Sequence, residues 1–283
     1  MNSVSFLKKI RRLGKFLNAL AKVSPALAGR AAFRAFSTPR RIPVHVQDQS
    51  FLAGATQSDF IAERIRIRVY EWKSKQAQGT VLLLHGWESN SARWRKFVKP
   101  LCDAGFSVYA FDAPAHGNSA GKEVNLPLYS RVIKAFMQRY GIPDALVGHS
   151  LGGAAVVMSM AAFEVPQVRK AVIMASFAES SRVMQDFGRL LDLQPAVLSC
   201  LNQEIERRSG LPIEGYTIQG KATLLLDVQG LVLHDRDDAV APVSEGAAIA
   251  ASWQARYVET IGLGHRMQDK AVVMTVVKFI SEG

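Results

Sequence analysis

Cysteine is scarce in this chain of 283 residues. Only Cys102 and Cys200 occur, and they form neither a CxxC pair nor a spacing typical of a metal site. The sequence therefore argues against a disulfide-stapled scaffold, and each cysteine is best interpreted as a small buried apolar residue. A reducing compartment such as the cytoplasm is compatible with this composition.

Long hydrophobic runs are also missing. No stretch approaches the roughly 18 to 20 uninterrupted apolar residues that a membrane-spanning helix requires. Hydrophobic residues nevertheless make up 48% of the chain, and single cores stop growing only at roughly 250 to 300 residues. We therefore expect one large soluble domain with a small appendage.

Acidic residues are absent from the first 47 positions, which contain ten basic residues: Lys8, Lys9, Arg11, Arg12, Lys15, Lys22, Arg30, Arg34, Arg40 and Arg41. The net charge of the whole chain is +11, so the remaining residues carry only +1. The basic character thus belongs to an N-terminal arm and not to the body. Because no base-reading motif accompanies it, we do not expect a nucleic-acid partner.

Apolar residues such as Ile10, Leu13, Phe16 and Leu17 recur in this arm at intervals of three and four, which predicts an amphipathic basic helix. Pro25 starts a second short helix, and the arm ends near Arg41. Three interpretations stay open: packing on the body, peripheral contact with a membrane surface, and a secretory signal. A mitochondrial presequence would have a similar composition.

The body, residues 42–283, alternates strands with helices. The segment 64–70 alternates polar and apolar side chains, as an early antiparallel strand with one solvated face would. Short apolar runs typical of buried parallel strands follow at 81–84, 107–111, 145–147, 172–175, 231–233 and 256–258. Helical stripes lie between them at 94–101 and 133–140, and a last one follows at 273–280. This order predicts an α/β fold with a mostly parallel, doubly wound sheet flanked by helices.

Ligands of such sheets bind at the carboxyl ends of the strands, where five of the six histidines lie: His85, His116, His149, His234 and His265. Ser150 follows one strand in the sequence Gly148-His149-Ser150-Leu151-Gly152 and precedes a helix. This GxSxG turn between a strand and a helix is typical of an exposed serine nucleophile.

A serine hydroxyl needs a base, and His265 follows the last predicted strand. An acid that orients the histidine is expected after the preceding strand, where Asp235, Asp237 and Asp238 are clustered. Glu179, after an earlier strand, is a more distant candidate. The chain order of serine, acid and histidine is the order seen on this kind of sheet.

At the segment 234–242 the chain resembles the α/β-hydrolase superfamily, whose members often have an HGxxDxxVP-like sequence there. Aligned on His234 and Pro242, the acid of the family falls on Asp238, with Asp237 as the alternative. Asp235 stands where the family usually has glycine. The resemblance extends from about residue 60 to the C-terminus.

The same resemblance implies an oxyanion hole. Leu83-Leu84-His85-Gly86-Trp87 is similar to the HGx loop of the family, so the backbone N–H groups of Trp87 and Leu151 would be the donors. Residues 111–119 resemble a DxPGHGxS element, which is structural in the family, with Ala115 in place of its usual glycine. Asp112 and His116 are therefore interpreted as scaffold.

An insertion at about 178–222, which contains two predicted helices, would form a small cap in such a fold. The expected activity is hydrolysis of a carboxylic ester or thioester through an acyl-serine, with no metal or organic cofactor and a small-molecule acyl substrate. The acyl group, the substrate-binding residues and the oligomeric state are not predicted. An acyltransferase, an amidase, a carbon–carbon hydrolase and a receptor without activity are the alternatives, because the fold does not decide among them.

Overall fold

The computed structural model describes residues 3–163 and 168–282. The first two residues of the expected arm lie outside this range. The chain forms two compact units. We call Pro39–Ala178 with Ile218–Gly283 the sheet unit, and Met1–Thr38 with Glu179–Thr217 the helical unit.

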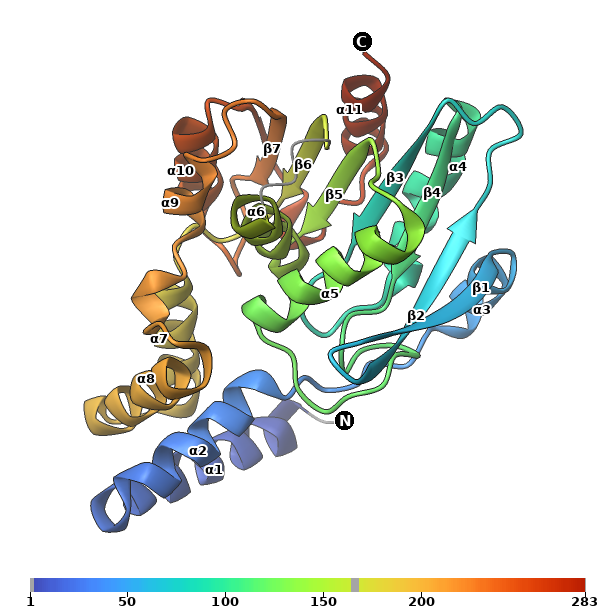
Figure 1. Cartoon of the computed structure of the whole chain (residues 1–283). Coiled ribbons are helices and arrows are strands. Elements are labelled where there is room, and N and C mark those ends of the chain that lie inside the picture. Colours follow the sequence, from blue (N-terminus) through green and yellow to red (C-terminus); the bar gives the residue numbers. More distant parts are fainter. Residues whose placement is uncertain (1–2, 164–167, 283) are drawn as a thin grey trace. The chain divides into compact units, whose positions relative to one another are not determined.

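The sheet unit is built on eight strands in the order β1-β2-β4-β3-β5-β6-β7-β8 (Figure 1). β1 pairs antiparallel with β2, β2 pairs antiparallel with β4, and all other neighbours are parallel. The bounds are β1 Thr56–Ala62, β2 Ile65–Trp72, β3 Gly79–Leu84, β4 Phe106–Phe111, β5 Ala145–His149, β6 Lys170–Met174, β7 Gln229–Asp235 and β8 Arg256–Thr260. This is the α/β-hydrolase fold, as the sequence predicts.

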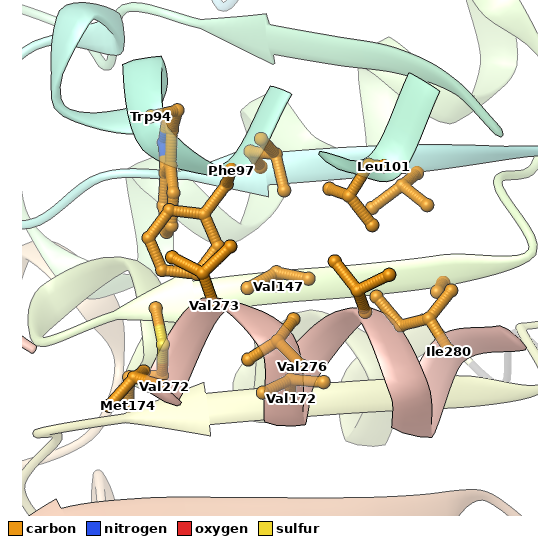
Figure 2. Close-up of a cluster of buried hydrophobic side chains, with 14 of the residues drawn as sticks. Trp94, Phe97, Leu101, Val147, Val172, Met174, Val272, Val273, Val276 and Ile280 are labelled. Carbon is orange, nitrogen blue, oxygen red and sulfur yellow. The ribbon is translucent and has the colours of Figure 1, made fainter. Parts of the chain in front are cut away.

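Helices cover both faces of this sheet (Figure 1). α4 (Arg95–Asp103) and α11 (Lys270–Ser281) lie on one face, while α5 (Leu126–Tyr140), α6 (Leu151–Phe163), α9 (Ile218–Ala222) and α10 (Val243–Trp253) lie on the other. Figure 2 shows the core under the first pair, where Trp94 and Phe97 meet Val273 and Val276 over the strand residue Val147. These are the apolar stripes expected from helical periodicity.

One strand was not expected from the sequence. β1 exposes most of its side chains and buries only Phe60 and Ala62. Its sequence, Thr-Gln-Ser-Asp-Phe-Ile-Ala, therefore has little apolar signal, and the pairing with β2 holds it in place. The short helix α3 (Val46–Ala53) was not expected either, because its apolar residues do not recur at helical intervals over so few positions.

The helical unit combines the N-terminal arm with the segment between β6 and β7. The arm forms α1 (Ser3–Val23) and α2 (Pro25–Ser37), which pack against α7 (Ser180–Leu191) and α8 (Pro195–Ser209) (Figure 1). Pro25 begins α2, because proline lacks the N–H that a continuing helix would need. The sequence predicts a cap at about residues 178–222. In the structure, the part of this unit that is inserted between β6 and β7 spans residues 179–217.

Two glycines let the backbones of this unit approach closely. A Cβ at Gly14 would lie 1.7 Å from the carbonyl oxygen of Leu191, and one at Gly29 would lie 2.5 Å from that of Cys200. Asn18 strengthens the contact, since its amide donates to the carbonyl of Asp192 and accepts from the N–H of Gln194. The arm is therefore fitted to α7 and α8 by backbone contacts as well as by apolar packing.

No helix in the described part of the chain has the length and hydropathy to span a bilayer.

Candidate active site

Ser150 lies at the turn between β5 and α6. Its backbone is left-handed, with φ 53°, which is costly for a non-glycine residue and typical of a strained functional turn. The turn is possible because glycines surround it: a Cβ at Gly152 would lie 2.3 Å from the carbonyl oxygen of Leu84. The N–H of Ser150 donates to the carbonyl of Met174 at 2.9 Å, which ties the turn to β6.

Asp238 and His265 are joined by a hydrogen bond. Nδ1 of His265 lies 2.8 Å from Oδ2 of Asp238. The carboxylate is fully buried, whereas the His265 side chain is 23% exposed. With the Nδ1 proton directed at Asp238, Nε2 of the imidazole is the nitrogen with a free lone pair. His265 comes from η3 (Gly264–Arg266), beyond β8, and Asp238 comes from the loop beyond β7.

Asp238 is held as a carboxylate. Burial opposes its ionisation, but hydrogen bonds from His234, from His265 and from the backbone N–H groups of Ala241 and Val240 outweigh that effect and hold the pKa of Asp238 well below its usual range. Oδ1 accepts both backbone bonds, at 3.0 and 2.8 Å, while Oδ2 faces the two imidazoles. A negative charge therefore stays beside His265.

His149, which directly precedes Ser150, contacts the loop that carries His265. Nε2 of His149 lies 2.6 Å from the carbonyl oxygen of His265, and the two imidazole rings are 4.8 Å apart. Burial, with Arg93 nearby, holds the pKa of His149 well below its usual range, so this ring is a neutral donor. Among the described residues no hydrogen bond joins the Ser150 hydroxyl to His265; such bonds often tighten only when substrate is bound.

The two expected oxyanion donors are free within the described part of the chain, where neither the N–H of Trp87 nor that of Leu151 has an acceptor. Leu151 opens α6, so its N–H has no partner inside the helix. The loop of Trp87 lies against the serine, because a Cβ at Gly86 would be 2.8 Å from Cβ of Ser150. An oxyanion formed at Ser150 would find N–H groups on both of these segments.

His85 orients this loop. Its Nε2 accepts from the N–H of Ala113 at 2.9 Å, so Nδ1 carries the proton and donates to the carbonyl of Gly86 at 2.8 Å. That carbonyl belongs to the same trans peptide as the N–H of Trp87, so fixing one fixes the opposite direction of the other. Burial holds the pKa of His85 well below its usual range. The ring is therefore neutral, and its two hydrogen bonds fix the position of the loop.

Asp112 and His116 hold the neighbouring loop together. The buried Asp112 carboxylate accepts from the N–H and hydroxyl of Ser91, the hydroxyl of Tyr70 and the N–H of Asn118. His116 accepts from the N–H of Glu88 at 3.0 Å. Among the described residues, neither Asp112 nor His116 has a hydrogen bond to Asp238 or His265. Ala115 adopts φ 65°, which explains why a glycine is usual at its position.

The other acidic candidates lie elsewhere. Asp237 is exposed, and its carboxylate accepts from the N–H of Gly262 at 3.0 Å. Glu179 belongs to the helical unit and accepts from the hydroxyl of Thr217 at 2.6 Å. Of the candidates, Asp238 is the one whose carboxylate has a hydrogen bond to His265.

Asp235 positions the loop that carries His265, a role that the sequence did not suggest. Its buried carboxylate accepts from the hydroxyl of Thr260 and from the backbone N–H groups of Leu263, Gly264 and Asp237. Burial opposes ionisation of Asp235, but these bonds outweigh it and lower the pKa. The residue that replaces the glycine of the family thus holds the loop that carries His265.

Two further contacts hold this loop from the other side. Arg93 donates to the carbonyl of Arg266 at 2.8 Å, and Lys96 donates to that of Gln268 at 3.0 Å. Both come from the turn and helix that follow the loop of Trp87. Arg93 has no recognisable motif, so only the structure could assign it this contact.

In the described residues, no group of three or more His, Cys, Asp or Glu side chains could hold a metal ion. Cys102 and Cys200 are free thiols.

Comparison with known proteins agrees with the fold. Residues 79–198 match the family model described as alpha/beta hydrolase fold. This match, together with the order of the strands, shows that the sheet unit has the alpha/beta-hydrolase fold.

Individual relatives are distant. A monoacylglycerol lipase of Mycolicibacterium smegmatis is 24% identical over 73% of this chain and 69% of its own length. A pimeloyl-[acyl-carrier protein] methyl ester esterase of Vibrio vulnificus is 26% identical over 51% of this chain and 54% of its own length. Among solved structures, an esterase of Pyrococcus furiosus superposes with a TM-score of 0.63 at 18% identity, over 86% of this chain and 95% of that one.

Proposed function

We propose that this chain is a serine hydrolase that cleaves a carboxylic ester or thioester through an acyl-serine intermediate on Ser150. The observation that carries the proposal is the Asp238–His265 hydrogen bond beside a serine in a left-handed strand-to-helix turn. The names of the relatives, a lipase and two esterases, support an ester as the substrate.

In the first half of the reaction, Oγ of Ser150 attacks the carbonyl carbon and its proton passes to Nε2 of His265. Asp238 keeps the imidazole in the tautomer with the proton on Nδ1 and stabilises the cation that forms. His265 then gives the proton to the leaving alcohol or thiol as its bond to carbon breaks.

The tetrahedral intermediate places a negative charge on the former carbonyl oxygen. The N–H groups of Trp87 and Leu151 would stabilise that charge, and each such donor is worth roughly 2.7 to 4 kcal/mol in the transition state. In the second half, water gives a proton to His265 and attacks the acyl group. The carboxylic acid leaves and Ser150 regains its proton.

Fluorophosphonate labelling tests the proposal. We expect the native chain to be labelled and the Ser150→Ala variant to remain unlabelled, because the probe reacts with an activated serine. A chain-length series of p-nitrophenyl esters should then show turnover by the native chain alone. Labelling that survives the substitution would contradict the assignment of Ser150, while labelling without turnover of any ester would favour the amidase, carbon–carbon hydrolase or receptor alternatives.

The role of Asp235 can be tested separately. We expect Asp235→Asn to lower kcat by about 10²-fold with little change in KM, because the loop carrying His265 loses acceptors for its N–H groups and a misplacement of about 1 Å has that effect. The rate of fluorophosphonate labelling should fall in parallel, measured well below the unfolding temperature. Glu259→Gln, which removes only a surface pair with Arg236 near the same strand end, is the control. Native kcat and labelling in Asp235→Asn would show that the loop needs no such anchor.

A further inference from the structure

The outward faces of α1 and α2 combine positive charge with exposed apolar side chains. We call this set the arm surface: Lys8, Lys9, Arg11, Arg12, Lys15, Lys22, Arg30 and Arg34, with Phe16, Val23 and Leu27. All of these residues belong to the helical unit. The basic side chains are all exposed.

The apolar members do not complete the packing of the unit. Phe16 is 57% exposed, Val23 is 85% exposed and Leu27 is 52% exposed. The side of α1 that packs inward carries Gly14 and the fully buried Leu17 instead. Phe16 and Val23 are seven residues apart, two helical turns, so they lie on the same stripe and face solvent together.

The stripe also contains cations. Lys8, Arg12, Phe16 and Val23 follow one another at intervals of four, four and seven residues, which places them along one side of α1. Basic and large apolar groups are thus mixed on one exposed surface. An interfacial helix has the same mixture, with lysine and arginine beside aromatic and aliphatic side chains.

The eight basic side chains of the arm surface form no ion pairs within the described part of the chain. The inserted segment 179–217 has more acidic than basic residues. Several of these acidic residues form ion pairs with arginines of the same segment. Asp186 pairs with Arg182 and Arg189, and Glu204 pairs with Arg207 and Arg208.

We infer that the arm surface binds the surface of an anionic lipid bilayer, with α1 and α2 lying in the plane of the interface. Each lysine or arginine near such a surface is attracted to the acidic headgroups, and the exposed apolar side chains enter the acyl boundary. A nucleic acid would match the charge but would leave Val23 and Leu27 without an apolar environment. A bilayer satisfies both parts of the surface.

Vesicle flotation with the full chain carrying Ser150→Ala tests this inference without lipid turnover, so that its outcome is independent of the proposed activity. We expect the protein to float with phosphatidylcholine vesicles that contain about 30% phosphatidylglycerol and to stay behind with pure phosphatidylcholine. Raising the salt to about 0.5 M should release it, because the charges are then screened.

Two sets of substitutions separate the two contributions. Lys8→Gln, Arg12→Gln and Lys15→Gln together should weaken the partition by about 100-fold, at about 1 kcal/mol per cation. Phe16→Ser with Val23→Ser should weaken it by about tenfold or more. Ile61→Ser and Lys73→Gln, which alter an exposed apolar residue and an exposed cation of the sheet unit, should have no effect.

Four results would overturn the inference. The first is no flotation of the chain with anionic vesicles at low salt, and the second is flotation of the arm variants equal to that of the chain with its native arm. Alternatively, size-exclusion chromatography could show a dimer that Phe16→Ser with Val23→Ser converts to a monomer, or an oligonucleotide could bind where vesicles do not. A second copy of the chain or a nucleic acid would then be the occupant.

Discussion

Replacing His265 with glutamine is expected to lower kcat for ester hydrolysis by roughly 10⁴- to 10⁶-fold, the range found when a serine triad loses its base. Glutamine can still donate an N–H to Asp238, so the buried carboxylate keeps a partner. It has no basic nitrogen, however, and cannot take the proton of Ser150. The loss should therefore fall on kcat, with KM much less affected.

The matched control is His45→Gln. His45 is exposed and precedes α3, away from the strand ends, so its substitution should leave kcat unchanged. Fluorophosphonate labelling of the His265 variant should be slowed as strongly as turnover. If the His265 variant kept activity within about tenfold of the native value, a different base would have to act on Ser150.

Replacing Asp238 with asparagine is expected to lower kcat by about 10⁴-fold. The amide can turn its NH₂ group toward His265, which then accepts at Nδ1 and carries its proton on Nε2. That tautomer cannot accept the proton of Ser150. Because hydrogen bonds hold the pKa of Asp238 well below its usual range, the native carboxylate is charged throughout the neutral range, and its loss also removes the stabilisation of the imidazolium.

Asp237→Asn is the matched control for this position. Asp237 is adjacent in sequence and equal in chemistry, but it is exposed and its carboxylate accepts from the N–H of Gly262 and not from His265. A small effect at Asp237 beside a large one at Asp238 would identify the acid. The reverse result would contradict the assignment and favour Asp237.

Much of the site could be predicted because its motifs are local. The elbow at Ser150 is a strand, a tight turn and a helix in consecutive residues, and the approach of Gly152 to the carbonyl of Leu84 explains why only a small residue fits there. The apolar stripes of α4 and α11 could also be predicted. A period of 3.6 residues is visible in the sequence whichever element the stripe packs against.

Other features depended on contacts between distant segments. The choice among Asp235, Asp237 and Asp238 is a matter of which carboxylate reaches an imidazole 27 residues further along the chain. The anchoring of the histidine loop by Asp235 and Arg93 has no local signal, because the donors and acceptors involved are mainly backbone groups brought together by folding.

The arm shows the same division. Its charge and its amphipathic period could be seen in the sequence, but an amphipathic helix has the same pattern whether its apolar side faces protein or lipid. The structure showed that the side with Gly14 and Leu17 packs inside the helical unit while Phe16 and Val23 remain exposed. The sequence by itself thus determined the fold class and pointed to Ser150 and His265 as the candidate nucleophile and base, because each follows from a local period or a turn. Only the tertiary structure showed that Asp238 is hydrogen-bonded to His265, which groups hold the histidine loop and which face of the arm stays exposed, because those depend on distances between segments that are far apart in the chain.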